Sequence, residues 1–242
     1  MDTIPEALPS ALTPIGNPQN LFIHWYYDLN PVEFLQVIAP LSLFFLGGLF
    51  LFSLLFGKGQ RSSGEKALQI KPKGYFYPFA LVILVLAAMR FLPVYVGIIV
   101  LLYAVIWDRK SLKIDYPLLL LFLCLFGLTE NVKALLSSRV VAHPRHVFVL
   151  AAVLSQFISN VPAALLLAKL TSQWQALLWG GSVGGVGNVF ASLANLIAYR
   201  LFVTSPEAER IPPARFLLQF TAMGYLAFAM GIALFEFRTL WV

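Results

Sequence analysis

The sequence predicts an all-α, polytopic membrane protein, and three observations support this fold class. First, 60% of the 242 residues are hydrophobic and only 12% are charged, whereas a soluble domain carries about 25% charged residues. Second, the apolar residues form runs long enough to cross a bilayer, which takes about 20 residues. Third, the basic residues lie mostly in short segments between those runs. This composition excludes a soluble globule, and the distribution of basic residues argues against nucleic-acid binding.

The apolar runs give the expected order of spans. The first clear span covers residues 34–56 and precedes a polar linker, 57–74, which contains five basic residues. The apolar stretch 75–107 is interrupted by Arg90 and Pro93. Since proline disfavours helix at the preceding residue, we expect two short spans that meet at a turn there. The remaining apolar segments cover 116–136, 147–170, 174–202 and 216–237.

The distribution of Lys and Arg indicates how these segments are oriented. With the linker 57–74 in the cytoplasm and 147–170 folded as a hairpin that returns to its own side, eleven of the 17 basic residues lie inside. A full crossing by 147–170 would leave eight inside against nine outside. The positive-inside rule therefore favours a re-entrant hairpin over 147–170.

Irregular backbone is expected in segments 13–20, 159–162 and 180–195, which are rich in Pro, Gly, Asn and Ser. Unpaired peptide groups are costly in lipid, so such breaks persist only where they are buried in protein or line a cavity. Carbonyl groups freed by a break can coordinate Na⁺, and helix N-termini attract an anion. Simple close packing of helices is the alternative interpretation of the glycine pairs Gly180/Gly184 and Gly181/Gly185.

Two of these breaks resemble each other. When segment 13–21 is aligned on segment 188–196, the long spans that follow also correspond. The predicted topology places the two copies in opposite orientations, a pattern typical of secondary transporters. The alignment pairs Thr13 with Asn188, Gly16 with Ala191, Asn17 with Ser192, and Asn20 with Asn195.

Segments 13–20 (TPIGNPQN) and 159–163 (SNVPA) resemble signatures of the ion-transporter superfamily. That group includes citrate-transporter-like permeases, arsenite pump membrane subunits, sodium/proton antiporters of the same fold and sodium/dicarboxylate symporters. The chain resembles most the anion-permease branch with the citrate-transporter-like domain, from about residue 12 to 237. The resemblance implies a second inverted repeat with a re-entrant hairpin and a broken transmembrane helix, plus the tail of the first repeat.

The resemblance also implies a division of the chain into three parts. Residues 1–56 are expected to end the first repeat, 57–74 to form a cytoplasmic linker, and 75–242 to form the second repeat. In that second repeat the hairpin covers 147–170, the broken helix 174–202 and the last span 216–237. Because family members carry two full repeats, we expect this chain to be N-terminally truncated or to be one half of a split transporter.

Ten residues are candidates for binding an ion and a substrate, by resemblance to the family. Asn and Ser side chains supply neutral hydrogen-bond donors and acceptors without the cost of a buried charge. The hairpin tip contributes Ser159 and Asn160, the second-repeat break contributes Gly187, Asn188, Ser192 and Asn195, and the first-repeat break contributes Thr13, Gly16, Asn17 and Asn20.

The function expected from these features is secondary active transport of a carboxylate or oxyanion, coupled to Na⁺ or H⁺, in the inner membrane. A Na⁺/H⁺ antiporter of the same fold and a non-transporting, truncated or split membrane subunit are the alternatives. The sequence has none of the HExxH, GxSxG or phosphate-loop motifs of soluble enzymes. We therefore expect no enzymatic activity and no cofactor, apart from Na⁺ as a coupling ion. The expected partners are the lipid bilayer, a small anion, and an N-terminal half-transporter chain or a second copy.

Three ionisable residues in or near apolar segments also have an expected role. His24 stands beside Trp25, Tyr26 and Tyr27, a pattern typical of an interfacial aromatic belt. Arg90 is expected to extend its side chain to the lipid headgroups. Glu130 is interpreted as half of an exposed or partly buried pair with Lys133, with a role as an intramembrane proton carrier as the alternative.

Overall fold

The computed structural model describes residues 12–56, 76–93, 95–108, 142–205 and 211–239, with scattered positions between 116 and 127. The regular secondary structure of these residues is helical, without β-strands, which confirms the predicted all-α class. The expected linker 57–74 lies outside the described residues, as does most of the expected span 116–136 together with Glu130.

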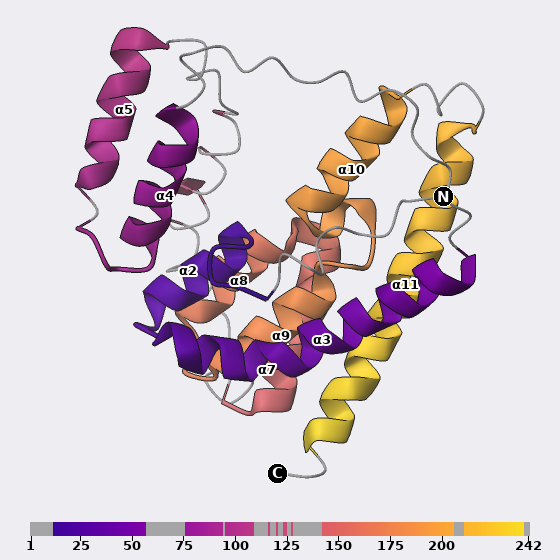
Figure 1. The fold of residues 1–242 in the computed structure, drawn as a ribbon. Coiled ribbons are helices and arrows are strands. Elements are labelled where there is room, and N and C mark those ends of the chain that lie inside the picture. The colour runs from indigo at the N-terminus through magenta and orange to yellow at the C-terminus, as the bar shows by residue number, and fades with distance from the viewer. Residues whose placement is uncertain are drawn as a thin grey trace.

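Two of the helices in Figure 1 are long and apolar enough to cross a membrane, over Pro31–Leu51 and Pro213–Arg238. They match the first and last spans predicted from the sequence. The helices, in chain order, are α2 (Pro18–Tyr26), α3 (Pro31–Phe56), α4 (Phe76–Ala88), α5 (Val96–Trp107), α7 (Pro144–Ile158), α8 (Asn160–Ala168), α9 (Trp174–Gly184), the 3-10 helix η3 (Val189–Ala191), α10 (Leu193–Val203) and α11 (Pro213–Thr239).

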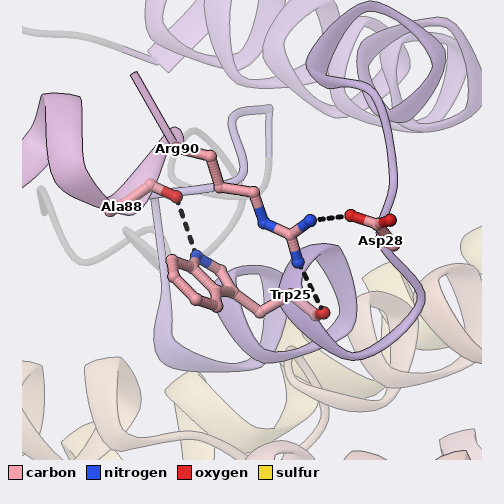
Figure 2. A network of polar contacts seen from close by, with 4 residues as sticks. All are labelled: Trp25, Asp28, Ala88 and Arg90. Atoms are coloured by element: carbon pink, nitrogen blue, oxygen red, sulfur yellow. Dashed lines mark hydrogen bonds and ion pairs between the residues drawn. The ribbon is translucent and has the colours of Figure 1, made fainter. Parts of the chain in front are cut away.

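The turn expected within the apolar stretch 75–107 is present between α4 and α5. These two helices form a pair that stands apart from the central group of helices (Figure 1). The extension of Arg90 to the lipid headgroups stays a prediction, and Arg90 also has partners within the protein. Its side chain forms an ion pair with Asp28, donates to the Trp25 carbonyl at 3.0 Å and lies over the Trp25 ring (Figure 2). The Trp25 indole in turn donates to the Ala88 carbonyl at 2.8 Å, so the end of α4 is attached to the end of α2.

The centre of the fold is formed by α7, α8 and α9, which pack against one another. Every residue of α8 is buried. A helix that is apolar on all sides is buried either in protein or in lipid, and here other helices of the protein surround it. With nine residues, α8 is about 13 Å long, less than half of the roughly 30 Å hydrocarbon core of a bilayer. The second arm of the predicted hairpin is therefore a short helix enclosed in protein.

The long helices α3 and α11 pack on one side of this centre. The Trp179 indole of α9 donates to the Val37 carbonyl of α3 at 2.8 Å. Arg238 of α11 donates to the same carbonyl at 3.3 Å and lies over the Trp179 ring. Next to them the rings of Phe148 and Phe235 stack with their centroids 3.8 Å apart. These contacts fix the two long helices against α9, whose far end carries the second break.

The helix α2 packs against α8 and α9 through a buried face. Its end is fixed by the Tyr27 hydroxyl, which donates to the carbonyls of Ala168 and Thr171 at 3.0 and 2.8 Å. The expectation that His24 belongs to an interfacial belt is wrong, because its side chain is only 1% exposed. The neighbouring Tyr26 is 44% exposed and stays compatible with an interfacial position.

Candidate functional site

The first candidate element is the break between α7 and α8, where the chain changes direction at Ser159. The backbone of Ser159 has φ 72° and ψ 155°, a conformation that favours glycine and costs a serine of the order of 1–3 kcal/mol. The next residue, Asn160, is buried. Because the helix restarts at Asn160, Pro162 falls in the first turn of α8, where proline needs no hydrogen-bonded N–H.

The second candidate element is the predicted break between α9 and α10, which includes the short helix η3. The Asn188 side chain accepts from the Phe190 N–H at 2.8 Å and so caps η3. The Ser192 hydroxyl accepts from the Asn195 N–H at 3.3 Å and caps α10. The Asn195 amide donates to the carbonyls of Gly185 and Asn188 at 2.9 and 2.8 Å. Side chains thus satisfy peptide groups that a continuous helix would have paired internally.

The hairpin and the second break face each other. The Ser159 hydroxyl donates to the Ala191 carbonyl at 3.4 Å. From α7, the Gln156 amide donates to the Gly184 carbonyl at 2.6 Å, and the Asn188 amide donates back to the Gln156 carbonyl at 3.1 Å. Four elements separated in sequence by up to 35 residues, from Gln156 to Ala191, therefore meet at one place: the end of α7, the start of α8, the end of α9 and η3.

The glycine pairs predicted from the sequence have different neighbours. A Cβ at any of the four positions would lie within 3 Å of a neighbouring atom. These glycines thus allow close packing, which brings side chains of other helices to the backbone of α9, while a role in a backbone binding site stays a prediction. Gly180 and Gly184 face α7, Gly181 faces Gln19 of α2, and Gly185 faces Asn160 of α8.

The first break, before α2, has a similar local structure. The Asn17 side chain caps α2 and accepts from the Asn20 N–H at 2.7 Å. The Asn20 amide donates to the Thr13 carbonyl at 3.0 Å, and the Gly16 N–H donates to the same carbonyl at 3.1 Å. A short irregular turn followed by a capped helix is therefore present here too.

The hydrogen bonds of the two breaks correspond under the alignment of segments 13–21 and 188–196. The bond from Asn20 to the Thr13 carbonyl corresponds to that from Asn195 to the Asn188 carbonyl. The caps Asn17 and Ser192 also correspond. The same holds for the Gly16 and Ala191 N–H groups, which donate to the carbonyls of Thr13 and Asn188, each at 3.1 Å. The two segments thus fold alike, while their opposite orientation in the membrane stays a prediction.

The centre between the breaks is rich in peptide dipoles and poor in charge. From residue 147 to residue 198, Lys169 is the only side chain with a formal charge. The Oδ1 atom of Asn195 and the Oε1 atom of Gln19 are buried and have no hydrogen-bond partner among the described residues. An unpaired buried acceptor costs about 1–3 kcal/mol. Such oxygens are ready to receive a donor or a cation.

The ten predicted site residues are distributed over two neighbouring places. Asn188, Ser192, Asn195 and the glycine at 187 are brought together with Ser159 and Asn160 around the second break. Thr13, Gly16, Asn17 and Asn20 form the first break, which precedes α2. The two places are linked through α9, because Gln19 of α2 donates to the Leu178 carbonyl at 3.5 Å and lies on Gly181.

Sequence reasoning missed three residues that contact the second break. Gln156 could have been found, since it is the only amide in α7 and lies one helical turn before Ser159. Gly224 and Tyr225 of α11 gave no such signal. A Cβ at Gly224 would overlap the carbonyl oxygens of Val186 and Gly187, and the Tyr225 hydroxyl accepts from the Asn188 amide at 3.4 Å.

An apolar, all-helical protein with paired helix breaks and a neutral, dipole-rich centre has the features of a membrane transport protein. Comparison with known proteins agrees with this class and gives the family. The chain belongs to the citrate transporter family, which matches residues 3–205.

Two curated relatives are similar to the chain. The uncharacterized transporter MJ0456 of Methanocaldococcus jannaschii is 34% identical over 195 residues, which cover 79% of this chain and 54% of the relative. The inner membrane protein YbiR of Escherichia coli is 34% identical over 209 residues, covering 79% of this chain and 55% of the relative. The chain thus spans about half the length of these relatives. No solved structure matches it.

Proposed function

We propose that this membrane transport protein carries a small carboxylate or oxyanion across the inner membrane, coupled to Na⁺ or H⁺. The observation that carries the proposal is the meeting of the hairpin tip with the second break, next to a first break of the same local structure. The family description supports a carboxylate such as citrate. The printed name of the Escherichia coli relative supports the inner membrane.

The residues suggest how each solute would be held. Helix N-termini carry a partial positive charge, so the starts of α8 and α10 and the side chains of Ser159 and Asn160 suit an anion. Carbonyl oxygens freed at the second break, together with Asn195 Oδ1, suit a desolvated cation. Because these are dipoles rather than full charges, burying the empty site costs less than burying an unpaired charge would.

The proposal is tested by uptake of radiolabelled citrate, succinate or phosphate into liposomes that contain the purified chain. An imposed Na⁺ gradient and an imposed pH gradient are applied separately, and we expect accumulation under at least one. Abolition of uptake by an ionophore that collapses that gradient confirms the coupling. Absence of gradient-driven uptake of all three anions would contradict the proposal.

The same liposomes distinguish the alternatives. Proton flux that follows Na⁺ or Li⁺ and ignores added anions would identify an antiporter. The chain is also assayed together with an N-terminal half-transporter chain, the partner expected from the sequence. Uptake that appears only in this mixture would identify a split transporter, whereas the absence of flux in every combination would identify a non-transporting subunit. Cross-linking of the chain in the same membranes tests the second expected partner, another copy of itself.

A further inference from the structure

The hydroxyl group of Tyr225 on α11 lies at the second break and keeps its hydrogen for a further partner. Its oxygen accepts from the Asn188 amide at 3.4 Å. Within the described part of the chain, this hydroxyl donates to no other residue. Because a phenol can accept and donate at the same time, the contact with Asn188 leaves one donor free.

The depth of Tyr225 in the membrane is unusual for a tyrosine. It lies about 18 Å from the first residue of α11 and about 21 Å from the last, near the middle of a helix that is long and apolar enough to span a bilayer. Membrane tyrosines gather instead at the two interfaces with water. A hydroxyl donor that faces hydrocarbon is unfavourable. We therefore expect the Tyr225 hydroxyl to face protein or a polar solute rather than lipid.

The contacts around Tyr225 place it where the hairpin and the second break meet. A Cβ at the preceding residue, Gly224, would overlap two carbonyl oxygens of the break, so α11 lies directly on this backbone. The Asn188 amide that Tyr225 accepts from also donates to the Gln156 carbonyl of the hairpin at 3.1 Å. The Asn188 carbonyl accepts from the Asn195 amide at 2.8 Å. The free hydroxyl donor thus belongs to the proposed site.

Most side-chain donors at this place are already used within the protein. The amide groups of Gln156, Asn188 and Asn195 each donate to two oxygens of the chain or more. The Ser159 hydroxyl donates to the Ala191 carbonyl. An anion that used these donors would take them from protein acceptors, which is unfavourable where the acceptor is buried.

Three side chains at the second break keep hydrogens that they donate to no other described residue. They are Asn160, Ser192 and Tyr225. Asn160 is 6% exposed and Ser192 is 4% exposed, whereas Tyr225 is 43% exposed. Tyr225 is therefore the accessible member of this set. Residues 216–235 of α11 include no charged side chain that would compete with it for an anion.

We propose that the Tyr225 hydroxyl donates a hydrogen bond to the transported anion, an inference that rests on the proposed function and deepens it. The anion at the starts of α8 and α10 is held by neutral dipoles, because these segments carry no basic side chain. A hydrogen bond to a charged acceptor is stronger than one between neutral groups, so a single phenol contributes strongly. Asn188 is a positioning residue here, since its amide holds the phenol oxygen and leaves the O–H free.

The experiment measures citrate binding to the purified chain in detergent by titration calorimetry. In Tyr225→Phe the Kd should rise about tenfold or more, the loss expected for a hydrogen bond to a charged group. The unfolding temperature should change little, because the Asn188 amide keeps its bond to the Gln156 carbonyl. The matched control is Tyr95→Phe, at an exposed tyrosine between α4 and α5, and it should bind citrate as the wild type does.

A second variant separates donation by the phenol from its support of Asn188. Replacement of Tyr225 by 3-fluorotyrosine makes the hydroxyl more acidic, and therefore a better donor and a poorer acceptor. At a pH where the phenol stays neutral, we expect tighter citrate binding than in the wild type. A role only as an acceptor for Asn188 predicts weaker binding, so unchanged or weaker binding would overturn the proposal. Because this variant keeps both ring and hydroxyl, it also provides the test if Tyr225→Phe does not fold.

The outcomes separate the two proposals. Equal Kd values of the wild-type protein and Tyr225→Phe would overturn the role of Tyr225 while leaving anion transport in place. Absence of citrate, succinate and phosphate binding to the wild-type protein would overturn both.

Discussion

The two helix breaks share a backbone structure and differ in what faces them. Both place an asparagine amide on a carbonyl seven residues earlier and both start the next helix with a side-chain cap. The second break is met by the hairpin through Gln156 and Ser159. The first break leads into α2, which is held by α8 and α9. The local motif is therefore independent of the neighbours that pack on it.

The helices that follow the two breaks differ in their polar residues. In the alignment of the two segments, His24 and Gln19 of α2 correspond to Tyr199 and Ala194 of α10. The α2 residues are fully buried, whereas Tyr199 and Ala194 are partly exposed. The comparison teaches that the two breaks have similar caps. The residues of the helix that follows each break differ in polarity and burial.

Asn195→Ala is expected to have the largest effect on this comparison. The change removes the donor to the carbonyls of Gly185, which is buried, and Asn188, which is partly buried and still accepts from the Ala191 N–H. We expect the free energy of unfolding to fall by about 2–4 kcal/mol and gradient-driven uptake to be lost. Chemical denaturation in detergent and uptake by liposomes measure the two effects. A comparable loss of stability and uptake in Asn20→Ala would show that the two breaks are equivalent. Wild-type stability and uptake in Asn195→Ala would contradict the role given to this amide.

Gly224→Val should disturb only the second break. The new side chain would overlap the carbonyl oxygens of Val186 and Gly187, which are backbone atoms and cannot easily move. We expect a loss of about 1–3 kcal/mol in stability, together with weaker uptake. Gly47→Val is the matched control, because no atom lies within 4 Å of a Cβ at Gly47. Stability is measured by thermal unfolding in detergent. Equal unfolding temperatures of Gly224→Val and Gly47→Val would argue against close contact of α11 with the break.

Ser159 allows strain and chemistry to be separated. Ser159→Gly relieves the positive φ and should raise the free energy of unfolding by up to about 1 kcal/mol. It also removes the hydroxyl that donates to the Ala191 carbonyl, so uptake should fall. Ser159→Ala removes the same hydroxyl and keeps the strain. A more stable and less active Ser159→Gly is the expected result, and full activity of both variants would exclude a role for the hydroxyl.

Asp28→Asn should have the smallest effect and tests the attachment of α4 to α2. The Arg90–Asp28 pair is exposed on the Asp28 side, where solvent screens the attraction. We expect a change of about 0.5 kcal/mol or less in stability, reduced further by added salt. Trp25→Phe serves as the stronger comparison, because it leaves the ion pair in place and removes the indole donor to the Ala88 carbonyl. Equal and large effects of both variants would mean that the ion pair matters more than its exposure suggests.

Much of the fold could be predicted from residues with restricted backbone behaviour. Pro93 and Arg90 marked the turn between α4 and α5, and the run from Ser159 to Pro162 marked the start of α8. Such positions are readable in sequence because proline, glycine and capping asparagines act locally. The capping roles of Asn17 and Asn188 follow from the same local chemistry.

The residues that the sequence did not reveal depend on packing between distant helices. His24 looked like part of an aromatic belt because its neighbours in sequence are aromatic, yet α2 turns it inwards. Arg90 reaches Asp28, which is 62 residues away in the chain. Gly224 matters only because α11 crosses the second break. No local pattern reports such contacts, since they arise when separate segments come together.

The enclosure of α8 has a consequence for how the bilayer acts on this protein. All nine residues of α8 are covered by other helices, so its environment does not vary with the length of the lipid chains. The long helices α3 and α11 carry many exposed apolar side chains and must adapt to membrane thickness by tilting. Thinner or thicker membranes therefore act first on the outer helices, while the inner arm of the hairpin is shielded from them.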